Sequence, residues 1–291
     1  MISSPRFKQL LGALKTWSNE LRTFDHVHHV DVGFRYRGGE RTNSLAIRLF
    51  IHGKKATKAK SRKLAPRTWR GHPVDVISST FRRHCASTPE PRRLSQTIPL
   101  LGGISIGTDG GGPGTLGMVV RSTKCPGLLV LTCNHVADSH AQVFQPAPAD
   151  SPDARMFGET VYTSRSDLAS IVRIYDIAAS ERAILGLPLS KGVVGAESLI
   201  ELCTEHAEVV KSGRSTATTT GHLDGLSDTG TISIVNPEDS PQPEVACEGD
   251  SGAIWMTRDG KAVGMHYAGE PWRACAQAMY LIQRNLGLLI P

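Results

Sequence analysis

The feature that most constrains the fold of this chain is the shortness of its apolar runs, which turn-forming residues interrupt throughout its 291 residues. Glycine occurs 29 times, and it punctuates segments such as the β-branched run that starts at Gly127. Short apolar segments bounded by turn residues are typical of β-strands, whereas helical proteins need longer amphipathic stretches. The pattern therefore predicts a mainly β fold, and the length allows two domains.

A change of composition near residues 88–98 marks a domain boundary. Residues 88–93 read Thr-Pro-Glu-Pro-Arg-Arg, and two prolines with charge are typical of a linker. We therefore expect a small N-terminal α+β domain at residues 1–94 and a larger β domain at residues 95–291.

The N-terminal domain carries one helical and two strand patterns. Residues 6–24 place an apolar residue every three or four positions, which predicts an amphipathic helix. Its apolar face consists of Phe7, Leu10, Leu11, Leu14, Trp17 and Leu21. Residues 29–36 and 45–51 predict two strands joined by a turn at residues 37–40. This domain can bury its apolar face on itself or on the β domain, and we expect it to dock there.

Much of the net charge of +6 lies in one block, residues 54–70. It holds eight basic residues and no acid: Lys54, Lys55, Lys58, Lys60, Arg62, Lys63, Arg67 and Arg70. A solvated loop between strands is the favoured interpretation, and contact with nucleic acid or an acidic protein is the alternative. Trp69 is the only aromatic residue in the block, so no base-stacking platform is expected.

Several classes of protein are not expected. No stretch of about 18 apolar residues occurs, so we expect no membrane span. The first residues lack the apolar run of a secretory signal, so we expect a cytoplasmic protein. The six cysteines form no C-x-x-C pair, so zinc is not expected, nor is any other metal or cofactor. In a reducing compartment we expect most of these cysteines to be buried thiols.

Residues 249–252 read Gly-Asp-Ser-Gly, and an apolar run follows at residues 253–256. A serine between glycines in a tight turn is a common way to present a nucleophile. The glycines allow a sharp bend and leave room for a substrate carbonyl. The amides of Gly249 and Ser251 can then converge on an oxyanion. Because turns are rich in these residue types anyway, a structural turn is the alternative.

His135 follows directly on the predicted strand 127–132, where the chain should turn. A histidine at that place can act as a general base near neutral pH. A carboxylate should orient it, and Asp167 fits because it opens the apolar segment 167–172. Asp176 is the alternative, and Asp167 is favoured because it leads the cleaner strand. The order His135, Asp167, Ser251, with spacings of 32 and 84 residues, is that of the chymotrypsin superfamily.

These motifs, Leu-Thr-Cys-Asn-His-Val, Asp-Leu-Ala and Gly-Asp-Ser-Gly, resemble those of trypsin-like serine peptidases. The remainder is similar to one branch of them, intracellular bacterial relatives of the plant narrow-leaf peptidases. The resemblance covers roughly residues 28–290 and includes further segments at residues 35–42, 72–77, 103–107, 114–117 and 210–216. It implies a chymotrypsin-like double β-barrel, an acyl-enzyme mechanism and a C-terminal helix around residues 276–286.

The resemblance also raises two questions around the nucleophile. The spacing of Cys247 and Cys275 resembles a disulfide that flanks the specificity pocket of digestive serine proteases. In secreted trypsins, the residue at the position of Asp250 pairs with an α-amino group that chain cleavage releases. Here an entire N-terminal domain precedes the peptidase region. Either Asp250 finds an internal donor, or the N-terminal domain must be cut or moved.

The specificity pocket of this family lies between the residues just before the nucleophile and a strand about 15 residues after it. The first wall, Val245 and Ala246, carries no acid, so a trypsin-like preference for Lys or Arg is not expected. The second wall contains His266, Tyr267 and Gly269. His266 resembles the histidine of staphylococcal glutamyl endopeptidases and picornaviral processing proteases, which implies Glu or Gln at P1. A barrel histidine turned away from the pocket, with a small or apolar P1, is the alternative.

Two hypotheses from different classes remain at this point. The favoured one is a serine endopeptidase that acts on protein or peptide substrates. The other is a silent or zymogen-like peptide-binding module on a protease fold, with nucleic-acid contact through the basic block.

Overall fold

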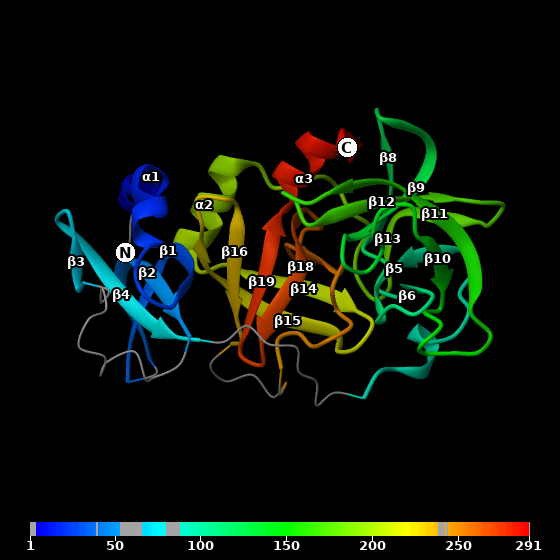
Figure 1. Cartoon of the computed structure of the whole chain (residues 1–291), viewed down its shortest axis with the longest axis horizontal. Helices are drawn as coiled ribbons and strands as arrows, with labels where there is room; N and C mark the ends of the chain where they lie inside the picture. The colour runs from blue at the N-terminus through cyan, green and yellow to red at the C-terminus, as the bar shows by residue number, and fades with distance from the viewer. Residues whose placement is uncertain are drawn as a thin grey trace. The chain divides into compact units, whose positions relative to one another are not determined.

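The computed structural model describes residues 4–38, 40–52, 66–79, 88–237, 242 and 244–290 (Figure 1). The chain forms two compact units. Unit 1 comprises Met1–Phe81, Ala196–Ala207 and Leu223–Ser233, and unit 2 comprises Arg82–Gly195, Glu208–His222 and Ile234–Pro291. The first unit thus takes in two later segments that a single cut between residues 94 and 95 would leave out. The domains expected from the sequence stay a prediction.

Unit 1 is an α+β assembly. Its elements are α1 (Ser4–Leu21), β1 (Val27–Arg37), β2 (Glu40–Ile51), β3 (Thr68–Trp69), β4 (His72–Ser78) and α2 (Ala196–Glu205). β1 and β2 form an antiparallel hairpin, and β4 runs parallel to β2. The end of β15 (Ala217–Leu226) pairs with β1. The predicted helix is confirmed, and its apolar face is buried except at Trp17, which is half-buried.

Unit 2 contains a six-stranded closed barrel and a second sheet. The barrel region uses β5 (Leu100–Gly102), β6 (Ser105–Thr108), β7 (Gly114–Thr115), β8 (Met118–Ser122), β9 (Cys125–Cys133), β10 (Gln142–Gln145), β11 (Arg155–Ser164), β12 (Ala169–Ile174) and β13 (Ala179–Ile184). Its strands are rich in β-branched and aliphatic residues, which suit a pleated, buried surface. β9 lies between β8 and β12, so its end carries His135 into the next turn.

The second sheet of unit 2 presents the other half of the site. Its strands β14 (Glu208–Gly213), β17 (Ile254–Met256), β18 (Ala262–Glu270) and β19 (Arg273–Ala278) are consecutive neighbours. β14 also pairs with the first part of β15. The predicted C-terminal helix is α3 (Met279–Leu286), which ends at Gly287. The predicted fold class, a mainly β double barrel with a small N-terminal α+β part, is confirmed.

The expectations for the basic block and for a membrane span can be compared only with the described residues. Of the basic block 54–70, residues 54–65 lie outside them, so its interpretation stays open. Among the described helices, none combines the length and apolar character needed to cross a bilayer.

Candidate active site

The segment 248–252, called the nucleophile turn here, lies directly before β17 and contains Ser251. Gly249 has φ +93° and Gly252 has φ +103°, conformations that favour glycine. A Cβ at Gly252 would also lie 2.6 Å from Thr132 Oγ1, so no side chain fits there. Ser251 is half-buried, and its hydroxyl donates to the Tyr267 carbonyl over 3.4 Å. The local geometry therefore requires the two glycines predicted to flank the serine.

Two side-chain hydrogen bonds fix the peptide planes of this turn. The Ser215 hydroxyl donates to the Glu248 carbonyl over 2.5 Å, and the Thr115 hydroxyl donates to the Gly249 carbonyl over 2.8 Å. In a trans peptide the N–H points opposite to the preceding carbonyl. The Gly249 amide therefore points away from Ser215. Within the part of the chain that the structure describes, the amides of Gly249 and Ser251 donate to no protein acceptor.

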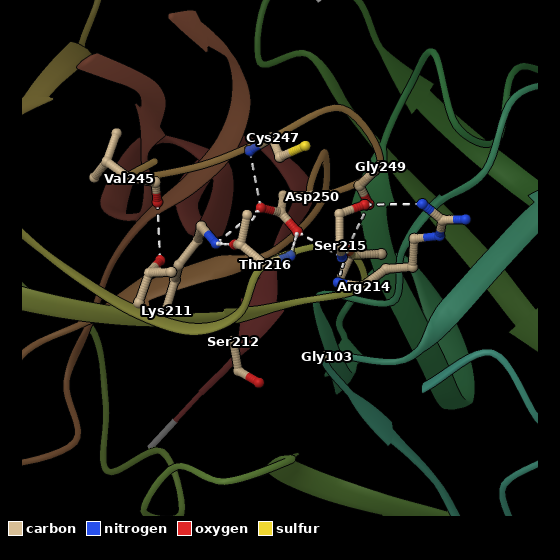
Figure 2. Close-up of polar contacts among 12 residues, drawn as sticks. Gly103, Lys211, Ser212, Arg214, Ser215, Thr216, Val245, Cys247, Gly249 and Asp250 are labelled. Atoms are coloured by element: carbon tan, nitrogen blue, oxygen red, sulfur yellow. Dashed lines mark hydrogen bonds and ion pairs between the residues drawn. The ribbon is translucent and has the colours of Figure 1, made fainter. Parts of the chain in front are cut away.

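Asp250 points inward from the turn and is completely buried (Figure 2). Lys211 Nζ lies 2.9 Å from Asp250 Oδ2, and it is completely buried as well. The Thr216 hydroxyl donates to Oδ2 over 2.6 Å, and the Cys247 amide does so over 3.0 Å. The Ser215 amide donates to Oδ1 over 2.8 Å. The carboxylate is thus saturated by donors from two segments of unit 2.

Burial and charge oppose each other at this ion pair. Burial alone raises the pKa of the Asp250 carboxyl, but the Lys211 charge and the hydrogen bonds outweigh it and lower that pKa to about 2. Burial lowers the pKa of the Lys211 ammonium below its ordinary value, although Asp250 opposes this. Asp250 is therefore ionised at neutral pH and stays paired as long as Lys211 keeps its proton.

His135 lies in the turn after β9 and is exposed. The amides of Val136 and Ala137 both donate to the Cys133 carbonyl over 3.1 Å, which tightens this turn. The end of β9 also contacts the nucleophile half of unit 2: the Cys133 thiol lies 3.1 Å from the His266 carbonyl. His135 therefore occupies the strand-end position that the sequence predicts.

Asp167 lies in the turn between β11 and β12 and is 3% exposed. The strand ladder pairs Ala169 with Cys133, and the Asn134 amide donates to the Leu168 carbonyl over 3.0 Å. The structure thereby brings the turns of Asp167 and His135 side by side. Asp176, the alternative carboxylate, is exposed. Of the two carboxylates, only Asp167 has the burial expected of an orienting residue.

Two residues that the sequence did not single out hold the Asp167 carboxylate. Asn285 Nδ2 on α3 donates to Oδ1 over 2.8 Å, and the Ser164 hydroxyl donates to Oδ2 over 2.6 Å. Ser164 lies three residues before Asp167 and carries a local signal, because serine often bonds to nearby groups in turns. Asn285 is 118 residues away, so no local pattern could indicate it.

The predicted pocket walls lie on the turn before Ser251 and on β18. Val245 and Ala246 are buried, and the Val245 amide donates to the Pro271 carbonyl over 2.9 Å. The pairing of β18 with β19 is irregular between His266 and Ala268, which leaves Tyr267 between two ladder pairs. Such bulges re-aim side chains near sites. Tyr267 and Gly269 are half-buried.

His266 is 3% exposed, and its Nδ1 has no hydrogen-bond partner among the described residues. The other ring nitrogen bonds to the Cys275 backbone. Burial, followed by the charge of Lys211, lowers the pKa of His266 to about 3, and Asp250 opposes this only in part. The imidazole is therefore neutral at physiological pH.

The cysteines near the site and the possible metal ligands were the remaining predictions. Cys247 is disulfide-bonded, whereas Cys275 is a buried thiol, so these two are not bonded to each other. Among the residues that the structure describes, no group of three His, Cys, Asp or Glu side chains could hold a metal ion.

No protein-family model matches the chain, and no curated protein matches it. Three solved structures illustrate what its fold is similar to. Protease A of Thermobifida fusca is 16% identical with a TM-score of 0.48, over 65% of this chain and 97% of the protease. A glutamic-acid-specific serine protease described as using a histidine triad in substrate binding is 16% identical with a TM-score of 0.47, over 66% and 100% of the two chains. The chymotrypsin of Cellulomonas bogoriensis is 16% identical with a TM-score of 0.47, over 66% and 97%. All three are proteases, and the similarity concerns the fold alone.

Proposed function

We propose that the chain is a serine endopeptidase that uses Ser251 as nucleophile and passes through an acyl-enzyme. The observation that carries this proposal is the nucleophile turn. It holds a half-buried serine between two glycines, and the amides of Gly249 and Ser251 are left without a protein acceptor in the described structure. Two such amides on one turn are the donors that an oxyanion requires.

In the proposed mechanism, Ser251 Oγ attacks the scissile carbonyl while His135 accepts the hydroxyl proton. The carbonyl oxygen becomes an oxyanion that the two free amides stabilise. The intermediate collapses, the C–N bond breaks, and His135 donates its proton to the leaving amine. Water, activated by His135, then hydrolyses the ester and regenerates Ser251. The long hydroxyl contact to Tyr267 is in keeping with a substrate-free site, where catalytic hydrogen bonds tighten only on binding.

Asp167 is proposed to orient the His135 ring and to stabilise the imidazolium. Its burial and its two fixed hydrogen bonds support that role, because a rigid carboxylate can hold one imidazole tautomer. The adjacency of the two turns, seen in the pairing of Ala169 with Cys133, supports the proposed pairing.

Fluorophosphonate labelling of the purified chain tests this function. The wild type should be labelled at Ser251, and Ser251→Ala and His135→Ala should abolish labelling. Asp167→Asn should slow labelling by several powers of ten, as expected for a wrong tautomer. Asp176→Asn is the matched control and should leave the rate unchanged. If no form of the protein is labelled, the chain is instead a peptide-binding module on a protease fold.

His266 is proposed to read the P1 side chain of the substrate. A neutral imidazole offers one N–H and one lone pair. With the other nitrogen bonded to the Cys275 backbone, Nδ1 remains available. A neutral ring gives no counter-charge to a buried carboxylate, so Gln should be preferred to Glu near neutral pH.

A library of fluorogenic peptides that differ only at P1 measures this preference. Wild type should cleave after Gln best and after Glu increasingly well as the pH falls and Glu becomes protonated. His266→Ala should lose cleavage after both and keep any cleavage after small apolar residues. Strong cleavage after Lys or Arg that survives in His266→Ala would rule out the assignment of His266.

A further inference from the structure

Asn285 lies in the last turn of α3 and contacts Asp167, which precedes it by 118 residues. Its Nδ2 donates to Asp167 Oδ1 over 2.8 Å, and its Oδ1 accepts a hydrogen bond from Arg284 Nε over 3.2 Å. An ionised carboxylate can only accept and a guanidinium can only donate, so these two neighbours fix which way the amide faces. Asn285 therefore presents an N–H to the Asp167 carboxylate.

The bound donors leave room on the Asp167 carboxylate for an imidazole. An ionised carboxylate accepts about four hydrogen bonds. Asn285 uses one position on Oδ1, and the Ser164 hydroxyl uses one on Oδ2 at 2.6 Å. Both donors are uncharged, so the carboxylate keeps the negative charge that would stabilise a His135 imidazolium. A lysine or arginine in the place of Asn285 would neutralise that charge instead.

Of these two donors, only Asn285 fixes the carboxylate relative to another element. Ser164 ends β11 and belongs to the same turn as Asp167, so it moves with that turn. Asn285 belongs to α3, whose residues Met279, Ile282 and Leu286 are buried in the barrel core. A donor held outside the turn resists a shift of the carboxylate, and a misplacement of about 1 Å in a catalytic group can cost about 100-fold in rate.

Donors from the turn between β8 and β9 hold the last turn of α3. The final carbonyls of a helix have no partner inside the helix. Lys124 Nζ donates to the Asn285 carbonyl over 2.6 Å, and the Ser122 hydroxyl donates to the Leu286 carbonyl over 2.7 Å. The charge of Lys124 also suits the negative end of the helix dipole. The backbone of Asn285 is therefore tied to the barrel.

We call residues 287–290, which follow α3, the C-terminal clasp. Gly287 has φ +61°, the left-handed conformation that commonly ends a helix. β20 (Leu288–Leu289) then pairs antiparallel with β8. Leu288 and Ile290 are buried in the barrel core. Movement of α3 away from the carboxylate would therefore require the C-terminal clasp to detach.

We propose that Asn285 is a positioning residue of the catalytic triad and that the C-terminal clasp holds it in place, so that the last residues of the chain set the rate of the chemical step. This inference rests on the proposed peptidase function. Asn285 acts through Asp167 and touches neither the substrate nor the reacting atoms. Its loss should therefore lower kcat and leave KM nearly unchanged.

Asn285→Leu is the first test, because leucine has a similar volume and no donor. The fluorophosphonate labelling rate and kcat should both fall about 10- to 100-fold, less than for Asp167→Asn, with little change in KM. Tyr280→Phe, on the same helix, is the matched control and should equal wild type. Labelling of Asn285→Leu at the wild-type rate would overturn the inference and leave the peptidase function intact. If wild type itself is not labelled, the peptidase function fails, and the inference fails with it.

A double-mutant cycle shows whether Asn285 acts through Asp167. Asp167→Asn already removes the carboxylate that Asn285 positions, so adding Asn285→Leu should cause little further loss. A variant that merely damages the fold would lose activity in both backgrounds. The same further loss in the Asp167→Asn background as in wild type would therefore overturn the positioning role.

The C-terminal clasp is tested where it meets β8. Ser122→Ala removes the donor to the Leu286 carbonyl, and kcat should fall several-fold with KM unchanged. Thr16→Ala is the matched control, since the Thr16 hydroxyl donates to the Gly12 carbonyl of α1 over 3.1 Å. In the Asn285→Leu background, Ser122→Ala should cost almost nothing more. An unchanged kcat in Ser122→Ala, or an equal loss in both backgrounds, would overturn the role of the C-terminal clasp.

Lys124→Met is the second variant if Ser122→Ala does not fold, because Lys124 is exposed and donates to the Asn285 carbonyl. Its kcat should also fall several-fold. Lys124 Nζ lies 4.6 Å from the centre of the Tyr162 ring as well, so Tyr162→Leu is the control and should keep the wild-type kcat. Equal losses in Lys124→Met and Tyr162→Leu would assign the effect to the ring contact and contradict the proposal.

Discussion

Two completely buried ion clusters, one in each unit, use opposite charges in different ways. In unit 1, Arg48 lies between Asp31 and Asp224, with Arg48 Nε 2.6 Å from Asp31 Oδ1. In unit 2, Asp250 is the one carboxylate among the described residues that forms an ion pair with Lys211. The Arg48 pKa is raised above its ordinary value although burial opposes this, because two carboxylates surround the guanidinium. The Lys211 pKa is lowered instead.

The two cations therefore differ in how firmly they hold their protons. Arg48 cannot lose its proton in any accessible range, and its cluster joins residues that are far apart in the chain and hold unit 1 together. The Tyr36 hydroxyl donates to Asp224 over 2.8 Å and the Ser233 hydroxyl to Asp31 over 2.7 Å, so the carboxylates are well satisfied. Lys211 can lose its proton, and its partner lies in the nucleophile turn. We therefore expect the first cluster to govern stability and the second to govern activity.

The largest effect should follow from Arg48→Met. It leaves Asp31 and Asp224 buried and mutually repulsive, and breaking such a pair costs about 3–5 kcal/mol. The free energy of unfolding, measured with urea, should fall accordingly, whereas Arg48→Lys should lose less. Labelling of Ser251 should persist wherever the variant is still folded by circular dichroism. A folded Arg48→Met that is no longer labelled would break the distinction between the clusters.

Each cluster also depends on glycine for space, which gives a matched pair of substitutions. A Cβ at Gly33 would overlap the Arg48 guanidinium, and a Cβ at Gly213 would overlap the Asp250 carboxylate. Gly33→Ala should lower stability by about 1–3 kcal/mol, as overpacking does, and leave labelling intact. Gly213→Ala should lower the labelling rate.

Controls for these two variants are available where an added methyl group meets open space. Gly12 on α1 and Gly195 in unit 2 have no neighbour within 4 Å of an added Cβ. Gly12→Ala and Gly195→Ala should match wild type in labelling. If Gly33→Ala loses labelling as completely as Gly213→Ala, the two clusters do not act separately.

The contrast between the clusters also explains which features the sequence could predict. Local patterns sufficed for the helix at the N-terminus, the strand before His135 and the glycine turn around Ser251. Their information lies within a few residues. Lys211 lies 39 residues before Asp250 and Asn285 lies 118 residues after Asp167, so their contacts depend on strand order rather than on any motif. The motif at residues 210–216 was visible, but its purpose was not.

The two later segments of unit 1 carry no sequence signal for the same reason. A linker composition marks where one segment ends, but it cannot reveal that the chain returns. Residues 196–207 and 223–233 belong to unit 1, and Asp224 supplies one of its two buried carboxylates. Only pairing of β1 with the end of β15 brings that residue to Arg48.

A smaller effect is expected in acid. Asp250 titrates at about 2 in the folded chain against about 3.9 when unfolded, which corresponds to about 2–3 kcal/mol of stability. Because the folded pKa is the lower one, this contribution is complete above about pH 4 and is lost as the pH falls towards 2. The Asp31 pKa is lowered as well, because the charge and hydrogen bonds of Arg48 outweigh the effect of burial. Unfolding free energies between pH 5 and 2 should therefore fall less steeply for Asp250→Asn than for wild type. Equal slopes would show that Asp250 contributes no such linkage.

The smallest effect concerns the thiols beside each region. Burial raises the pKa of Cys203 near the Arg48 cluster, and Asp224 and Asp31 raise it further. Burial also raises the pKa of Cys133 in unit 2. Of the thiols that the structure describes, Cys125 alone is half-buried rather than buried, so iodoacetamide should modify it before the others, with little loss of activity. The order of the other two, read by peptide mass spectrometry, reports which unit opens more often. Modification of Cys203 before Cys133 would mean that the surroundings of the Arg48 cluster open more often than the barrel core. Modification of Cys203 as fast as Cys125 would contradict the expectation that the Arg48 cluster stabilises unit 1.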